Sequence, residues 1–229
     1  MSSINESTVV VFDIRKFSEH RHHLGLKCGA HLLTDLVKDL IEKAVVIATQ
    51  KQHQFRSNKT PALNHTGDGF VLIVRGRNNP LIGLSFISEF RDMVFLRLKT
   101  YEKKRIEHFS DVRLTKLGFG IGAHWGLIEE FEFADFDGQT RKGYLGSAIN
   151  TASRVEQHTK NQKCNVICTK KLMQCALGCV QKRYHKQAKC FFTSLGVHPL
   201  PSFPTPRTLY GLNPGFHRDI FPCSINGQP

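Results

Sequence analysis

The sequence lacks a long uninterrupted hydrophobic run. No apolar segment of the 229 residues approaches the roughly 18 residues that a membrane-spanning helix requires. The opening residues, MSSINEST, also lack the basic and apolar regions of a secretory signal peptide. We therefore expect a cytoplasmic protein with no membrane partner.

Cysteine pairs of the kind that bind zinc are also missing. The chain has seven cysteines but no Cys-x-x-Cys pair. The pairs Cys164/Cys168 and Cys175/Cys179 lack the spaced histidine and cysteine partners of a zinc site. An odd number of cysteines in a chain without a signal peptide favours reduced thiols over disulfides.

Acidic residues are scarce. There are 19 against 32 basic residues, which gives a formal net charge of +13. Such a surface attracts polyanions, including nucleic acid, anionic lipid and nucleotide phosphates. The basic residues are dispersed, with denser patches at 103–105 and 182–189, and no nucleic-acid-binding module is recognisable. Nucleic acid is therefore not an expected partner.

Hydrophobic periodicity predicts strands that alternate with long helices, and 40% of the residues are hydrophobic, enough to build a core. This alternation is typical of an α/β or α+β sandwich. Strands are expected at 8–17, 115–133, 164–169 and 207–212, helices at 29–49, 80–105 and 145–159, and extended segments at 54–74 that close on an Asp68-Gly69 hairpin.

Two carboxylates mark strand ends. Asp13 follows the apolar run VVVF, and Asp68 stands between two glycines at the head of FVLIV. Carboxylates at adjacent strand ends suit hard divalent cations, and two such ions can clamp the oxygens of a phosphoryl transfer. Taken singly, a residue of either kind is more often an ordinary strand-end or turn residue.

The helix predicted at 145–159 presents two polar residues one turn apart. Asn150 and Arg154 project from one side, and a guanidinium and an amide at this spacing can grip a nucleotide across an interface. A solvated polar face is the alternative. The opposite, apolar face is predicted to contain Leu145, Ala148, Ile149, Ala152 and Val155.

Four sequence blocks, in the right order, resemble the class III nucleotidyl cyclases. They are VVVFDIRKFS, NHTGDGFVLIV, GFGIGAHWGLI and GYLGSAINTASRVEQHT, of which the last is the most specific, and SLGVHPLPSFPTPRTLYGL is similar to the family's closing hairpin. The blocks span residues 7–212, which are expected to form one cyclase domain. Residues 213–229 are expected to be a flexible tail.

The resemblance implies a ferredoxin-like, palm-type α/β (α+β) fold with an antiparallel-rich sheet and helices packed on it. It also implies a head-to-tail homodimer with shared active sites. Two Mg²⁺ or Mn²⁺ ions per site would be held by Asp13, Ile14 and Asp68 of one subunit. Asn150 and Arg154 of the other subunit would be catalytic, while the 3′-hydroxyl attacks the α-phosphate and expels pyrophosphate.

The resemblance also assigns the triphosphate to the segment after Asp13. Backbone amides of residues 14–18 would cradle it, with Phe17 and Ser18 as substrate-binding residues. The lysine that many relatives carry in the closing hairpin is not evident in HPLPSF. Lys186 and Lys189 are candidates to replace it.

Two further positions concern the base. Where adenylyl cyclases have Lys and Asp or Thr, and guanylyl cyclases have Glu and Cys, this chain has Asn64 and Gly143. This departure resembles the pyrimidine cyclases of bacterial Pycsar antiphage defence, which make cyclic UMP or cyclic CMP. Asn64 offers both a donor and an acceptor to a base edge. Arg56, on the preceding extended segment, is a further candidate. UTP is the favoured substrate, and a separate effector activated by the cyclic nucleotide is expected.

Other interpretations remain open. The enzyme could be a cytidylate or adenylate cyclase of the same fold. Alternatively, the chain could be a catalytically silent domain that senses nucleotides, or a basic nucleic-acid-binding protein. The glycines of GFGIGAHWG do not indicate a dinucleotide site, because an extended segment follows them instead of a helix. The histidines of EHRHH at 19–23 are predicted to lie in a basic loop near the triphosphate.

Overall fold

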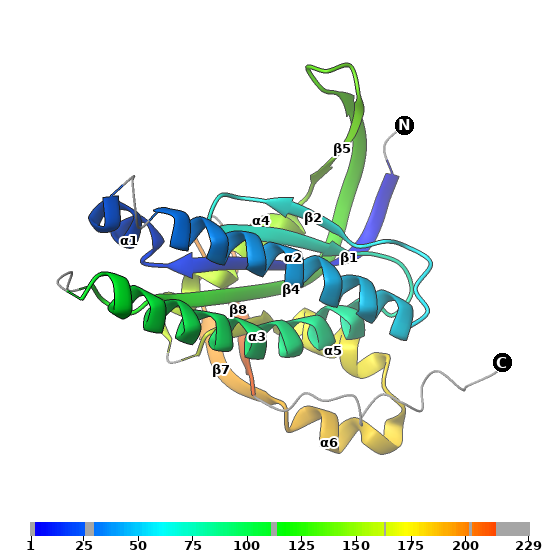
Figure 1. Cartoon of the computed structure of the whole chain (residues 1–229). Helices are drawn as coiled ribbons and strands as arrows, with labels where there is room; N and C mark the ends of the chain where they lie inside the picture. Colours follow the sequence, from blue (N-terminus) through cyan, green and yellow to red (C-terminus); the bar gives the residue numbers. More distant parts are fainter. Residues whose placement is uncertain (1–2, 26–29, 111–113, 163, 202, 214–229) are drawn as a thin grey trace.

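The computed structural model describes residues 3–25, 30–110, 114–162, 164–201 and 203–213. A mixed sheet forms the centre of the molecule (Figure 1), with strand order β2-β3-β1-β4-β6-β8-β7, and β5 pairs with β4 outside this path. All pairings are antiparallel except that of β4 with β6. The strands are β1 (Ser3–Arg15), β2 (Ala62–His65), β3 (Gly69–Val74), β4 (Gly118–Ala134), β5 (Thr140–Leu145), β6 (Val166–Thr169), β7 (Phe192–His198) and β8 (Arg207–Leu212).

Helices cover both faces of the sheet. The long helices α2 and α3 lie side by side over one face, and α4 lies behind the sheet on the other (Figure 1). Helix α5 packs on the same face as α3. The helices are α1 (Phe17–Leu24), α2 (Ala30–Gln54), α3 (Asn79–His108), α4 (Ser147–His158), α5 (Lys170–Gly178) and α6 (His185–Lys189).

The face under α2 and α3 is filled by large side chains. Because side chains alternate along a strand, Phe12 of β1, Phe70 of β3 and Phe119 of β4 all point to this face. Phe86 and Phe90 of α3 pack against them, with the Phe12 and Phe90 ring centroids 5.0 Å apart. These five phenylalanines are almost completely buried, and aromatic rings contribute heavily to core stability.

The face under α4 is packed by backbone contact instead. A Cβ atom added to Gly122 of β4 would lie 2.2 Å from the backbone nitrogen of Glu156 and 2.3 Å from the carbonyl oxygen of Ala152. A Cβ atom on Gly126 would lie 3.1 Å from that of Ala148. The glycines of GFGIGAHWG therefore let a helix lie directly on the strand.

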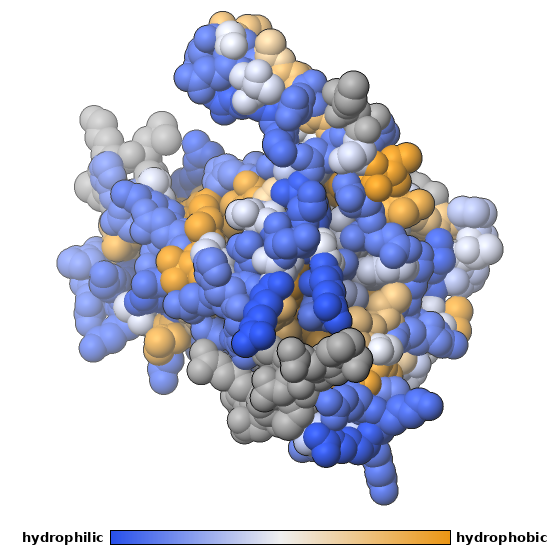
Figure 2. All heavy atoms as spheres, turned by 90° about the vertical axis from the view of Figure 1, so that its right-hand side faces the viewer, coloured by the Kyte–Doolittle hydropathy of each residue, from blue (hydrophilic) through white to orange (hydrophobic). Residues whose placement is uncertain are grey.

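Strands β4 and β5 form an arm that stands out from the body (Figure 1). Arg75, just after β3, pairs with Glu130 at the base of this arm, and its guanidinium carbon lies 5.4 Å from the ring centroid of Tyr144. On the side drawn in Figure 2, the arm rises above a largely hydrophilic surface on which hydrophobic residues form small separate patches.

The predicted elements are present, with corrections at their ends. The strand expected at 8–17 begins at Ser3 and ends at Arg15. The helix expected at 145–159 begins at Ser147, so Leu145 ends β5 and is 59% exposed instead of lying on the apolar face. The predicted tail lies outside the described residues, apart from Asn213.

Two further predictions, a loop at 19–23 and an extended segment that begins at 54, are also corrected. EHRHH belongs to α1, where buried His20 joins Tyr101 Oη at 2.9 Å and the carbonyl oxygen of Thr115 at 2.6 Å. The segment before β2 is not extended at its start, because α2 continues to Gln54. Arg56 lies in the turn that follows, with a left-handed φ of 49°.

Within the described residues, no helix is both long and apolar enough to cross a membrane. The five cysteines in this part of the chain are free thiols. The only tryptophan of the sequence, Trp125 of β4, packs against the main core, and the Lys171 ammonium of α5 lies 4.7 Å from its ring centroid.

Candidate active site

Strand pairing brings the two predicted metal ligands to the same end of the sheet. In the register, Asp13 of β1 lies opposite Gly69 of β3 on one side and Gly120 of β4 on the other. Asp68 is the residue immediately before Gly69, so its carboxylate sits at the tip of the strand beside Asp13. The predicted hairpin is therefore present.

Glycine is required on either side of Asp68 for two different reasons. Gly67 has a φ of 93°, which a residue with a side chain rarely adopts. Gly69 is required by space, because a Cβ atom there would lie 2.1 Å from the carbonyl oxygen of Phe12. The turn is held by His65, whose Nδ1 accepts a hydrogen bond of 3.3 Å from the Gly67 amide.

Negative charge is concentrated at this point of a basic chain. Burial raises the pKa of the Asp13 carboxyl above its usual value, and the charge of Asp68 raises it further. A third acid, Glu156 of α4, lies against the same strand end and is 4% exposed. Burial, followed by the charge of Asp13, raises the pKa of Glu156 from 4.5 to about 7.

This arrangement fits a divalent cation that keeps part of its own coordination shell. Among the described residues, Glu156 Oε1 and Arg15 Nε are buried without a hydrogen-bond partner beside Asp13. No group of three or more acidic, histidine or cysteine side chains in this part of the chain can hold a metal ion on its own. Mg²⁺ is commonly bound by one or two carboxylates, water and substrate phosphates, so Asp13 and Asp68 suffice. The side chain of Ile14 is buried in the core, and only its backbone could contribute a ligand.

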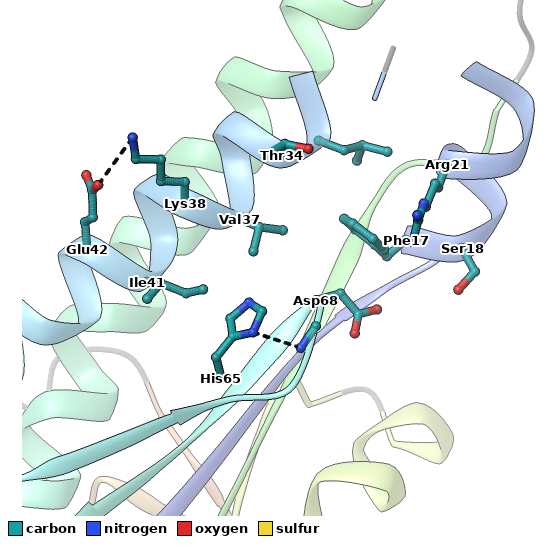
Figure 3. A pocket seen from close by; sticks show the side chains of 12 residues that line it. Phe17, Ser18, Arg21, Thr34, Val37, Lys38, Ile41, Glu42, His65 and Asp68 are labelled. Carbon is teal, nitrogen blue, oxygen red and sulfur yellow. Dashed lines mark hydrogen bonds and ion pairs between the residues drawn. The ribbon is translucent and has the colours of Figure 1, made fainter. Parts of the chain in front are cut away.

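A cavity of 720 Å³ opens next to Asp68. Figure 3 shows Phe17, Ser18 and Arg21 of α1 around Asp68, with His65 near the turn. The opposite wall comes from α2 and is mixed, with apolar Leu33, Val37 and Ile41 beside polar Thr34, Lys38 and Glu42. The predicted substrate-binding residues Phe17 and Ser18 thus share a cavity with Asp68.

The predicted catalytic pair lies on the outer side of α4. Asn150 is exposed, and Arg154 is half-buried, with Nη1 donating a 2.9 Å hydrogen bond to Gln157. At about 100° per residue, Arg154 points roughly opposite to Glu156, which faces Asp13. One copy of the chain therefore does not bring Arg154 to its own pair of aspartates.

The two predicted base-reading positions lie on different strands. Asn64 of β2 pairs with Val71 and is exposed. Gly143 of β5 pairs with Phe131 of β4, whose ring covers it so closely that a Cβ atom on Gly143 would lie 2.4 Å from Cζ of that ring. Phe131 thus takes the space that a side chain at position 143 would use.

Three further predicted residues lie apart from the acids. Arg56 is exposed at the far end of α2 from the cavity beside Asp68, and Lys186 and Lys189 are exposed on α6. Lys171 and Arg207, by contrast, line a smaller pocket of 250 Å³ at the end of β6.

Sequence reasoning missed Glu156 and Phe131. A signal for Glu156 was present, because an acid one residue after Val155 falls within the apolar stripe of α4. No comparable signal existed for Phe131, since its partner depends on the register of β4 and β5.

No protein-family model matches the sequence, and the comparison with curated proteins gave no match either. Solved structures are similar over nearly the whole chain. The adenylyl cyclase CyaB from P. aeruginosa is 17% identical with a TM-score of 0.65, covering 96% of this chain and 98% of that one. The guanylyl cyclase Cya2 is 14% identical with a TM-score of 0.66, covering 95% and 97%.

The guanylate cyclase domain of RhGC from Catenaria anguillulae, solved with GTP, is 14% identical with a TM-score of 0.62, covering 93% of this chain and 98% of that one. At such low identity the likeness establishes the fold alone. The chain has the fold of a class III cyclase catalytic domain, an open α+β sheet with helices packed against it.

Proposed function

We propose that the protein is a nucleotidyl cyclase that converts a nucleoside triphosphate into a 3′,5′-cyclic nucleotide and pyrophosphate. The observation that carries the proposal is the pairing of Asp13 with Asp68 at one sheet end, in a chain whose α4 also presents Asn150 and Arg154 on its outer side. The cyclase fold adds support, although a fold alone does not define an activity.

The site requires two copies of the chain. Arg154 faces away from the aspartates of its own subunit, so it can reach a triphosphate only across an interface. In a two-fold dimer, each contact occurs twice, and two sites form, each with aspartates from one subunit and Arg154 from its partner. Homodimerisation is therefore part of the proposal.

Each residue has a distinct task in the reaction. Asp13 and Asp68 would hold two Mg²⁺ or Mn²⁺ ions, which would supply charge neutralisation and activation of the 3′-hydroxyl. Phe17, Ser18 and the start of α1 position the triphosphate, and Asn150 orients the sugar. A bond forms between O3′ and the α-phosphorus as the bond to the β-phosphate oxygen breaks, while the hydroxyl proton leaves to solvent. Arg154 stabilises the charge on the phosphate.

UTP is the proposed substrate, with cyclic UMP as the product. Asn64 is neutral, and Gly143 is covered by the Phe131 ring, so neither position offers the charged partner that a purine edge would need. A site that hydrogen-bonds one base edge rejects others, because mismatching leaves polar groups unpaired. Cytidylate and adenylate cyclase activities are the alternatives on the same fold.

The sequence resemblance to Pycsar enzymes extends the proposal to a role in antiviral defence. The cyclic nucleotide would act as a second messenger for a separate effector protein. This part depends on the identity of the product, because a purine product would remove the link to pyrimidine signalling.

The test is incubation of the protein with equal concentrations of the four triphosphates and Mn²⁺ or Mg²⁺, with products identified by mass spectrometry. Cyclic UMP is expected as the main product. Cyclic CMP would change only the base, and cyclic AMP or cyclic GMP would overturn the pyrimidine assignment. Absence of any cyclic product, with triphosphate binding retained, would favour a catalytically silent sensor.

A further inference from the structure

A groove separate from the cavity beside Asp68 runs between α3 and the start of β4. It has a volume of 420 Å³, within the range of about 300–1,000 Å³ that small-molecule sites occupy. Its floor is apolar and comprises Phe95 and Leu98 of α3 with Leu117 and Phe119. Phe95 is 52% exposed, although its ring meets that of Phe119 edge to face with centroids 4.9 Å apart.

The charged residues around this groove are mostly basic. Lys99 and Lys103 of α3 and Lys116 before β4 surround the apolar floor. Among the described residues, neither Lys99 nor Lys116 forms an ion pair, and Lys103 is only 3.9 Å from Glu107 on its own helix. The single acid that lines the groove, Glu102, is already bound to Arg105 at 2.6 Å.

Helical spacing explains why these groups converge. Phe95, Lys99 and Lys103 follow one another at intervals of four, which places them along one side of α3. Leu98 and Glu102 belong to the adjacent row of the same helix. The result is a ligand site with an apolar floor and a cationic edge, a combination that suits a molecule with an apolar chain and an anionic head.

The groove adjoins β4, which is the neighbour of the strand that carries Asp13. Phe119 on its floor pairs with Ile14 of β1, and the next pair in the register is Asp13 with Gly120. Because side chains alternate along a strand, Phe119 points to the groove while Asp13 points to the other face. A molecule in the groove would contact β4, the strand that pairs with the Asp13 strand β1.

We propose that this groove binds a long-chain carboxylate, with its chain on Phe95, Leu98 and Leu117 and its carboxylate between Lys99 and Lys116. The chain removes exposed apolar surface from water, and the carboxylate can form ion pairs with two lysines that form none among the described residues. This site does not involve any residue of the proposed reaction.

The test is displacement of a dansyl-labelled fatty acid by dodecanoate, dodecanol or dodecyltrimethylammonium, each below its micelle-forming concentration. Dodecanoate is expected to displace the probe, and the other two are expected to be weaker by about tenfold or more. The double variant Lys99→Glu/Lys116→Glu should lose a similar factor, and Phe95→Ser should weaken all three competitors. Lys104→Glu, on the same helix but facing α2, is the control and should bind dodecanoate as the native protein does.

Several outcomes would overturn the proposal. Equal displacement by the three head groups would show that the lysines do not select charge. Unchanged binding by the double lysine variant, with an unchanged circular dichroism spectrum, would place the probe elsewhere. Binding only to vesicles that contain anionic lipid, and not to free dodecanoate, would identify a membrane surface instead of a ligand site.

Discussion

On one face of the sheet, α2 and α3 stand off from the strands on large aromatic side chains, whereas on the other face α4 lies against the glycines of β4. The first face tolerates small movements of its helices, because side chains can repack between the layers. The second face fixes its helix by contacts between backbone atoms, such as those of Gly122 with Ala152 and Glu156.

This difference matches the tasks of the two faces. The aromatic face contains most of the buried hydrophobic residues and supplies stability. The glycine face sets the position of α4, and with it the location of Glu156 beside Asp13 and of Arg154 on the outer side. A catalytic site that takes residues from two subunits would require such rigid placement of its groups.

The largest expected effect comes from separating the two halves of the proposed site. Asp13→Ala and Arg154→Ala should each lower cyclase activity by at least about a hundredfold. Mixing the two variants with subunit exchange should restore about a quarter of native activity, because half of the dimers are mixed and each has one intact site. Activity is measured by cyclic nucleotide formation, with heterodimers verified by mass.

A matched control uses the same mixing protocol. Asp13→Ala and Asp68→Ala remove two residues of the same half-site, so every mixed dimer has two damaged sites and no recovery is expected. Recovery in this control, or none in the Asp13/Arg154 mixture, would contradict the shared site.

A second prediction concerns the glycine face. Gly122→Ala places a Cβ atom against the α4 backbone, which cannot move like a flexible side chain, and should destabilise the protein by about 1–3 kcal/mol. Gly178→Ala is the control, because nothing lies within 4 Å of its added Cβ, and its stability should change by no more than about 1 kcal/mol. Urea unfolding measures both, and equal effects would argue against backbone contact as the cause.

A third prediction is a pH dependence due to Glu156. Its pKa is about 7 in the folded protein against the usual 4.5, so the folded state holds the proton more tightly than the unfolded state. The resulting stability is present below pH 4.5 and is lost as pH rises through about 7.

Glu156→Gln should remove this slope and, in metal-free protein above pH 7, raise stability by up to about 3 kcal/mol. Urea unfolding with a chelator present, from pH 5 to pH 8, provides the comparison. A slope that is identical in the native protein and the variant would show that Glu156 does not titrate in this range.

Much of the fold is predictable because long elements repeat their apolar residues. The pattern of α2 and α3 continues for many turns, and the apolar runs before Asp13 and after Asp68 indicate buried strands. Strand β5 was not predicted, because TRKGYL is short and largely polar, and its only support is its pairing with β4.

The candidate site likewise contains some residues that the sequence predicts and others that only the structure shows. Asp13, Asp68, Asn150 and Arg154 stand in recognisable sequence blocks, which is why the sequence alone predicts them as candidates. Glu156 was overlooked because a glutamate on a helix is usually solvated, and only the glycines of β4 bring it into the interior. Phe131 covers Gly143 through a register that no local pattern encodes.

Trp125 gives the protein an internal optical reporter. It is the only tryptophan, it is packed against the main core, and Lys171 of α5 lies over its ring. Its emission therefore arises from one known place, where β4 meets α5, on the aromatic side of the sheet. Gly122 and Glu156 belong to the opposite side of the sheet. If the tryptophan emission and the backbone signal change at different denaturant concentrations during unfolding, the two sides lose structure separately.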